Sequence, residues 1–345
     1  MLRKAIGLMI ILAAIIQSLS ILADFWRYPD SLETLLSANW ALLLLIVIEL
    51  ILVKNLPADR KMGFGKGLSV ALIAFIGSLT SAYLATVIYV DYRLPGRDYS
   101  DVYQSCFKVW AARGLVTEGP DITPGGTQNS IESIALAFAE GASGTEVDVF
   151  FDTDRGEFIV SHNYPYLLKN GEILTLEQLF EATGEQAYFW IDFKKIRHLD
   201  DEQLRQSVAE LTRISNSGTL KSRIYVEGEA PFSLAAYRDA GFQTIFDTHP
   251  EAQSSPFSSF MLNVYKSAFY FGDYSVMGMN YGRIDDPIYG ERAGQLLAGI
   301  PVFVYHVDDD AETLENLSKM DSVRVILVEN HSLNRYRLNG CAGNE

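Results

Sequence analysis

Two carboxylates and a histidine lie close together in the stretch Gly141–Asn163. Glu146 and Asp148 are separated by one residue in an apolar run, and side chains at positions i and i+2 of a strand point to the same face. Neighbouring carboxylates repel each other unless a cation or a proton lies between them, and hard divalent cations take such oxygen ligands. A turn at Asp154–Gly156 then returns the chain to His162, which titrates near neutral pH. The stretch therefore predicts a divalent-cation site with a proton-transfer group beside it.

Strand-like apolar runs alternate with helical patterns from residue 107 onward. This alternation favours parallel βαβ units, and the length fits one (β/α)8 barrel. Strands are expected at Phe107–Ala111, Thr145–Phe150, Tyr188–Phe193, Arg223–Glu227, Thr244–Asp247, Val276–Asn280, Val302–His306 and Arg324–Val328, with Glu157–Ser161 as a hairpin on the second. Helices are expected at Ser130–Glu140, Thr175–Ala182, Glu202–Ser215, Pro231–Ala240, Glu291–Leu297 and Ala311–Met320. The segment from Pro250 to Tyr274 fits neither pattern.

Polar residues stand at the carboxyl ends of these expected strands, which is where a (β/α)8 barrel carries its active site. They are Arg113, Glu146 with Asp148, Asp192 with Lys194, Glu227, Asp247, Asn280, His306 and Glu329. Any one of them could simply mark a strand that passes into a polar loop. Together they predict a shared site.

The amino-terminal quarter has a different character, with three apolar runs long enough to cross a bilayer, at about 6–23, 38–56 and 68–90. The first run could instead be a cleaved signal peptide. Residues 1–90 are therefore predicted to be a transmembrane region, 91–103 a polar linker and 104–345 the barrel. Basic residues before the first run and between the second and third favour a cytoplasmic amino terminus. We expect a multi-pass protein of the inner (plasma) membrane with its barrel outside the cytoplasm.

The composition narrows the choice of partners. The 345 residues carry a formal net charge of −15 and no basic stripe, which argues against nucleic-acid binding. The two cysteines, Cys106 and Cys341, are too few for a disulfide scaffold or a zinc-finger array. The first and last strands of a closed barrel are neighbours, so these two cysteines could form a disulfide.

The order and spacing of several short motifs resemble the glycerophosphodiester phosphodiesterase family, over roughly residues 107–331. That family has His-Arg-Gly on its first strand, Glu-Asn-Thr opening a helix, Gly-Ala before Glu-Leu-Asp-Val, a hairpin to His-Asp, then Thr-Leu-Glu-Glu-Leu, Glu-x-Lys and, late in the chain, Trp-Thr-Val-Asn. The corresponding residues here are Ala112-Arg113-Gly114, Gln128-Asn129-Ser130, Gly141-Ala142, Glu146-Val147-Asp148-Val149, His162-Asn163, Thr175-Leu176-Glu177-Gln178-Leu179, Asp192-Phe193-Lys194 and Val304-Tyr305-His306-Val307-Asp308.

The resemblance implies a role for each matching residue. Glu146, Asp148 and Asp192 would hold a Ca²⁺ or Mg²⁺ ion, with Asp192 in place of the family's usual Glu, as in the sphingomyelinase D branch of the wider group. The metal ion and the cationic side chains together would supply positive charge where negative charge builds up on a phosphodiester in the transition state. The resemblance also implies Arg113 and Lys194 on the phosphate oxygens, His162 as a general acid/base, and Asn129 shaping the site as a substrate-binding residue. From their places at strand ends, Glu227 is predicted as a further substrate-binding residue and His306 as a catalytic one.

The chain departs from the family pattern at Ala112, which stands where the family has its first histidine. Losing one of two proton-transfer groups costs on the order of 10²–10⁴ in rate. The missing histidine could be replaced from another strand end, with His306 and His331 as candidates. The substrate could have a leaving group that needs less help, or the protein could have lost catalysis and kept binding.

The sequence thus predicts a phosphoric diester hydrolase with metal-dependent activity. Its expected substrate is a glycerophosphodiester or a phospholipid head group at the outer face of the inner membrane. The alternative is a catalytically inactive barrel that binds a phosphorylated lipid or an envelope partner. The absence of the first histidine supports the alternative, while the retained carboxylates, Lys194 and His162 oppose it.

Overall fold

The computed structural model describes residues 83–116, 128–166, 168, 172–184, 187–215, 220–228, 230–307 and 310–328. The chain divides into two compact units, Met1–Arg93 and Leu94–Glu345. In the first unit the described residues, 83–93, are helical. All other elements belong to the second unit.

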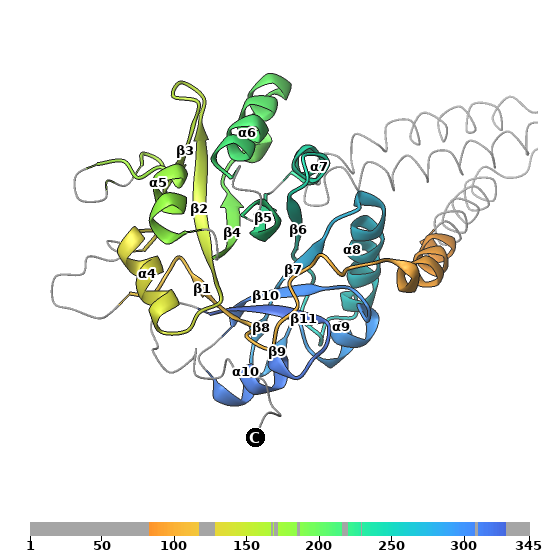
Figure 1. Cartoon of the computed structure of the whole chain (residues 1–345). Helices are drawn as coiled ribbons and strands as arrows, with labels where there is room; N and C mark the ends of the chain where they lie inside the picture. Colours follow the sequence, from red (N-terminus) through yellow and green to blue (C-terminus); the bar gives the residue numbers. More distant parts are fainter. Residues whose placement is uncertain are drawn as a thin grey trace, which may run out of the picture. The chain divides into compact units, whose positions relative to one another are not determined.

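Eight parallel strands close into a barrel in the described part of the second unit (Figure 1). They are β1 (Val109–Ala112), β2 (Gly144–Asp152), β4 (Tyr188–Phe193), β5 (Ile224–Glu227), β6 (Gln243–Thr248), β7 (Val276–Asn280), β10 (Val302–Val307) and β11 (Val323–Val328). Their order is β1-β11-β10-β7-β6-β5-β4-β2, and a pairing between β1 and β2 completes the ring. The predicted (β/α)8 barrel is confirmed.

Two short antiparallel pairings are added to the barrel. Strand β3 (Glu157–Val160) pairs with the far end of β2, so the hairpin extends beyond the neighbouring strands (Figure 1). Strands β8 (Gly282–Arg283) and β9 (Asp286–Pro287) form a small hairpin after β7, which the sequence did not predict.

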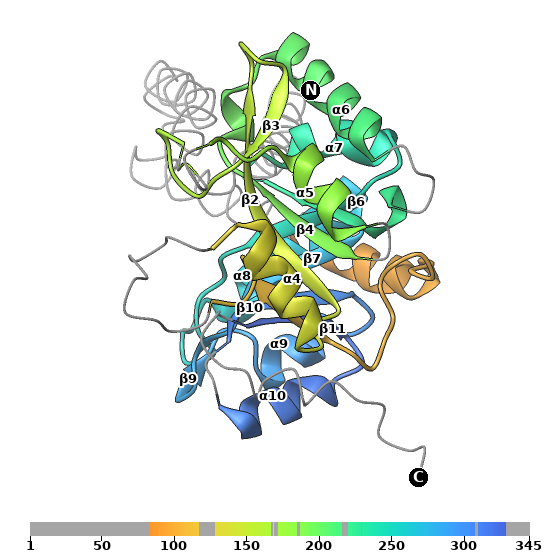
Figure 2. The same cartoon turned by 60° about the vertical axis from the view of Figure 1, so that its left-hand side comes forward.

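Helices lie around the outside of the barrel strands, as the two views in Figures 1 and 2 show. They are α4 (Ile131–Ala139), α5 (Leu176–Thr183), α6 (Asp201–Ile214), α7 (Pro231–Asp239), α8 (Ser258–Gly272), α9 (Glu291–Leu296) and α10 (Ala311–Ser318). Side-chain capping boxes at Ser130, Thr175 and Asp200 begin α4, α5 and α6, because each satisfies backbone N–H groups that the first turn leaves without partners.

Helix α8 occupies the segment that the sequence pattern left unassigned. Its aromatic residues Tyr265 and Phe269 are buried, as is Tyr274 just beyond its end. Phe246 of β6 stacks on Tyr274 with ring centroids 4.8 Å apart. These aromatic residues therefore belong to the core between α8 and the barrel.

The prediction of three transmembrane helices and a multi-pass inner-membrane location requires correction. No helix among the described residues is long and apolar enough to cross a membrane. Of the three predicted spans, only residues 83–90 fall within the described part of the chain, where they are helical. The remaining residues of the predicted spans lie outside the described residues.

The segment before β1 packs against the amino-terminal ends of the strands. Tyr103 is buried, its backbone N–H donates to the hydroxyl of Tyr225 (2.6 Å), and its ring meets those of Trp110 and Tyr188 edge-on at 5.2 and 4.8 Å. Phe303 joins the same aromatic cluster, 5.5 Å from Trp110. This end of the barrel is therefore filled with rings, and the opposite, carboxyl-terminal end carries the polar residues.

Gly144 opens β2 where it passes the face of Trp110, and a β-carbon there would lie 2.5 Å from a ring carbon. We predict that Gly144→Ala lowers the free energy of unfolding by about 1–3 kcal/mol, because the buried indole has little room to move. Gly294→Ala in α9 is the control, since its nearest neighbour is the end of Met320 at 3.4 Å. It should be neutral or stabilise by up to about 1 kcal/mol. Equal urea midpoints for the two variants would contradict this packing.

Cys106 takes part in a disulfide bond. The sequence has one other cysteine, Cys341, which lies outside the described residues. We predict that the denatured protein shows no reactive thiol before reduction and two after it, in a titration with a thiol reagent. Two reactive thiols without reductant would rule the pairing out.

Candidate active site

The loop after β1 turns sharply and brings Arg113 to the carboxyl-terminal end of the barrel. Arg113 and Asn129 have φ angles of 59° and 54°, and Gly114 has a φ of 83°. A β-carbon on Gly114 would meet Ser133 at 2.5 Å, so the turn needs glycine there. The Asn129 N–H donates to the Arg113 carbonyl oxygen (3.0 Å), which joins the two ends of the loop. Left-handed residues of this kind often mark functional sites.

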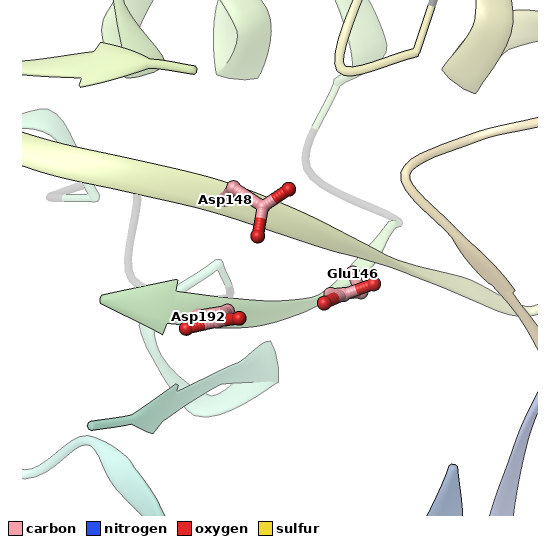
Figure 3. A group of neighbouring side chains, drawn as sticks. All are labelled: Glu146, Asp148 and Asp192. Atoms are coloured by element: carbon pink, nitrogen blue, oxygen red, sulfur yellow. The ribbon is translucent and has the colours of Figure 1, made fainter. Parts of the chain in front are cut away.

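Three carboxylates meet on the neighbouring strands β2 and β4 (Figure 3). Asp148 and Asp192 are register partners, and Glu146 lies two residues before Asp148 on the same face of β2. One oxygen from each lies within 4.8 Å of the others. The predicted metal-ligand set is thus gathered in one place by the strand register.

Asp148 is the best connected of the three, with 1% of its side chain exposed. Lys194 Nζ lies 2.8 Å from Oδ1. On Oδ2, Asn129 Nδ2 donates at 2.8 Å, His162 Nδ1 lies at 3.1 Å and Arg113 Nε at 3.9 Å. The Asn129 amide oxygen also accepts from the Asp148 backbone N–H (3.0 Å), so this buried residue fixes both backbone and side chain of Asp148.

The close packing of these charged groups shifts the pKa values of the three carboxylates. Burial raises the pKa of Asp192 to about 6, with a further contribution from the Asp148 charge against the opposing pull of Lys194. Burial and repulsion by Asp148 and Asp192 raise the pKa of Glu146 well above its ordinary value. Burial alone would raise the pKa of Asp148 too, but contacts from His162, Lys194 and Asn129 bring it below the ordinary range. Two of the three carboxylates therefore resist ionisation without a cation.

The residues present fit a hard divalent cation. Oδ1 of Asp148 is buried and accepts no well-directed hydrogen bond from the described residues, although the Lys194 ammonium lies beside it. Lys194 also contacts Asp192 directly. An all-oxygen ligand set with an orphaned buried oxygen suits Ca²⁺ or Mg²⁺, and such a charge would stabilise the ionised forms of Glu146 and Asp192.

A cavity of about 280 Å³ opens beside the three carboxylates at the carboxyl-terminal end of the strands. Its lining residues are Ala112, Arg113, Glu146, Asp148, His162, Trp190, Asp192, Lys194, Glu227, Asp247, His249, Tyr305, His306 and Leu327. Eight of the nine predicted site residues are among them; the ninth, Asn129, lies behind Asp148 and contacts it directly. The other candidate histidine, His331, lies outside the described residues, as does Glu329.

The part of the cavity lined by β5, β6 and β10 carries polar groups of another kind. Trp190 Nε1 donates to Glu227, and the Tyr305 hydroxyl donates to Asp247 Oδ1 at 2.9 Å. His249 Nε2 lies 3.5 Å from Asp247 Oδ2. Burial, followed by repulsion from Asp247, raises the pKa of Glu227 well above its ordinary value. The predicted site residues did not include Tyr305, whose inward position on β10 follows from the two-residue strand period.

No protein-family model matches the sequence. No curated protein sequence matches it either.

Several solved structures are similar to the chain, and they bear the name of the family that the sequence motifs resemble. A glycerophosphodiester phosphodiesterase from Parabacteroides distasonis is 18% identical with a TM-score of 0.47, covering 67% of this chain and 94% of its own. The enzyme of that name from Thermotoga maritima is 17% identical with a TM-score of 0.46, covering 67% and 95%. One from Agrobacterium tumefaciens is 14% identical with a TM-score of 0.44, covering 66% and 98%. At sequence identities this low, the function of this chain has to be argued from its own side chains in the cavity.

Protons and metal ions compete for the same carboxylate oxygens. With its pKa at about 6, the Asp192 carboxyl is mostly protonated at pH 5 and mostly ionised at pH 7, and the pKa of Glu146 is raised as well. We predict that the affinity for Mg²⁺ or Ca²⁺ rises about tenfold between pH 5 and pH 7, because the cation no longer has to displace the proton of Asp192. Isothermal titration calorimetry at the two pH values measures this. An affinity that does not change over the range would contradict the site.

Proposed function

We propose that this protein is a metal-dependent phosphodiester hydrolase. The observation that carries the proposal is the meeting, in one cavity, of a three-carboxylate cluster with Arg113, Lys194 and His162. A phosphodiester is an anion that resists attack, and its hydrolysis needs positive charge at the phosphoryl oxygens and proton transfer at the attacking and leaving oxygens. Metal ligands, cations and a histidine in this cavity meet those needs.

Glu146, Asp148 and Asp192 would hold Ca²⁺ or Mg²⁺, which when bound supplies Lewis-acid charge to the phosphate. Arg113 and Lys194 would bind phosphoryl oxygens. Nε of Arg113 is buried and donates no hydrogen bond to the described residues, so this donor can serve an anion in the cavity. Lys194 stands between Asp148 and Asp192, which raise its pKa against the effect of burial and keep it cationic.

His162 would carry a proton at Nε2. Its Nδ1 lies 3.1 Å from Oδ2 of Asp148, a carboxylate that would accept the Nδ1–H. This arrangement fixes the tautomer that leaves Nε2 for proton transfer, as an acidic partner does in other catalytic histidines. The side chain is 46% exposed, so water or substrate can reach it.

The substrate class we propose is a glycerophosphodiester or a phospholipid head group. A cavity of about 280 Å³ holds a small phosphodiester, and the acyl chain of a lipid substrate would stay outside it. Glu227 would bind the alcohol part of the substrate. Because its pKa is raised, the carboxyl keeps a proton that it can donate to a hydroxyl oxygen. His306 lines the same cavity and would contact the substrate as well.

Ala112 lines the cavity without a titratable group, so only part of the expected proton-transfer machinery is present at this strand end. A binding protein for phosphorylated ligands is the alternative that this residue favours. Turnover decides between the two, because both require the carboxylate cluster and its cations.

We predict that the full chain releases an alcohol from glycerophosphodiesters or lysophospholipids in the presence of Ca²⁺ or Mg²⁺, and not with EDTA. Asp148→Asn should lower the rate at least about 10²-fold by weakening the metal site. His162→Ala should lower kcat by about 10²–10⁴-fold while metal binding remains. His198→Ala is the matched control, because His198 is exposed on a 3-10 helix away from the cavity.

Product release is followed by ³¹P NMR over a panel of head groups. Metal-dependent turnover that both site variants reduce and the His198 control does not would support the enzyme. No turnover on the whole panel, while Mg²⁺ and inorganic phosphate still bind, would favour the binding protein.

A further inference from the structure

His306 reaches the cavity through an irregularity at the end of β10. Tyr305 precedes it and lines the same cavity, although successive strand residues normally point to opposite faces. The β10–β11 register shifts between Val304 and Val307, and His306 has a φ of 51°. A bulge of this kind re-aims a side chain, and a left-handed histidine is a conformation that the surrounding structure must hold in place.

One partner of His306 is Asn280, at the end of the neighbouring strand β7. Asn280 Nδ2 lies 3.1 Å from His306 Nδ1, and Asn280 Oδ1 accepts the backbone N–H of Gly282 at 2.7 Å. A backbone N–H can only donate, so it is the oxygen of the amide that faces Gly282 and the nitrogen that faces His306. The orientation of the Asn280 side chain is therefore decided by its other contact.

Gly282 is itself fixed by the small hairpin after β7. It pairs with Pro287 across β8 and β9, and the Ile288 N–H donates to the Tyr281 carbonyl oxygen at 2.7 Å. Its φ is 84°, and a β-carbon there would lie 2.8 Å from the Ile288 nitrogen. The hairpin thus needs glycine at this point and holds the N–H that orients Asn280.

These contacts decide which nitrogen of His306 carries the proton. Both hydrogens of the Asn280 amide are donors, so His306 Nδ1 has to accept, and the single ring proton lies on Nε2. A proton on His306 Nδ1 would place the ring N–H against an N–H of the Asn280 amide, with no acceptor between them. A histidine acts as a base at Nε2 only when its remaining proton can lie on Nδ1, and Asn280 opposes that state.

We propose that His306 is a fixed hydrogen-bond donor, with Asn280 as its positioning residue, and that it donates Nε2–H to an oxygen of the phosphodiester without carrying a proton in the reaction. This rests on the proposed function. The two histidines have different roles because their partners differ. His162 faces the Asp148 carboxylate, which accepts an N–H, whereas His306 faces an N–H of the Asn280 amide. The Tyr305 ring packs against the imidazole in a T-shaped arrangement, with centroids 5.0 Å apart and an interplanar angle of 75°, and helps to hold its plane.

The first test is spectroscopic and does not depend on turnover. Histidine in the full chain is labelled with ¹⁵N, and the His306 ring signals are assigned by their loss in His306→Gln. We expect Nε2 to be protonated and Nδ1 unprotonated at pH 7.5. In Asn280→Asp the carboxylate can accept from both Gly282 and the ring, so the proton should move to Nδ1. A wild-type ring protonated at Nδ1 would overturn the proposal.

The second test separates donation from proton transfer. The amide of His306→Gln keeps an N–H near the Nε2 position but has no useful basicity, whereas His306→Ala has neither. We expect His306→Gln to keep kcat within about fivefold of the wild type and His306→Ala to lose about 10–10²-fold. Equal losses of about 10²–10⁴-fold in both variants would identify a proton carrier and overturn the proposal.

Inorganic phosphate distinguishes failure of this inference from failure of the proposed function. If the wild type turns over no substrate, phosphate affinity in the presence of Mg²⁺ is compared among the wild type, His306→Gln and His306→Ala by calorimetry. Weaker binding in the Ala variant alone supports the donor role even without hydrolysis. Unchanged affinity in both variants would overturn it, whatever the activity.

Discussion

Mutual repulsion among Glu146, Asp148 and Asp192 is the constraint on which the rest of the site depends. Strand register brings their oxygens within 4.8 Å of one another, and burial raises the pKa of two of them. Lys194 and the buried Asn129 offset part of this repulsion at Asp148 without satisfying its Oδ1. A divalent cation would complete the compensation, so the arrangement is better suited to metal binding than to stability.

The cavity divides into two chemical environments. Around the cluster, Arg113 and Lys194 place positive charge where a phosphate would bind. Around β5, β6 and β10, the Tyr305 hydroxyl donates to Asp247, and the raised pKa of Glu227 keeps that carboxyl protonated as an uncharged donor. A ligand with an anionic centre and a hydroxylated end matches this division. With Ala112 supplying no proton carrier at β1, His162 is the histidine whose partner favours proton transfer.

Local patterns predicted the elements and much of the site. Apolar runs located the barrel strands, and the i, i+2 spacing put Glu146 and Asp148 on one face. What required the structure was contact between distant segments. The role of Asn280 depends on a bulge at His306 and on the Gly282 hairpin, neither of which leaves a periodic signal. Helix α8 escaped prediction because apolar and aromatic residues occupy consecutive positions in its sequence, so no single apolar stripe stands out. Hydropathy also predicted membrane spans that no described helix supports.

The central claim, that the carboxylate cluster is a metal site facing a phosphate subsite, is tested most directly by crystals grown with Mn²⁺ and inorganic phosphate. Mn²⁺ takes the same hard oxygen ligands and gives an anomalous signal. The account predicts one strong anomalous peak within about 2.0–2.6 Å of an oxygen from each of Glu146, Asp148 and Asp192. Phosphate should lie beside it, in contact with Arg113 and Lys194. Saturating Mn²⁺ with no peak among these carboxylates would contradict the account.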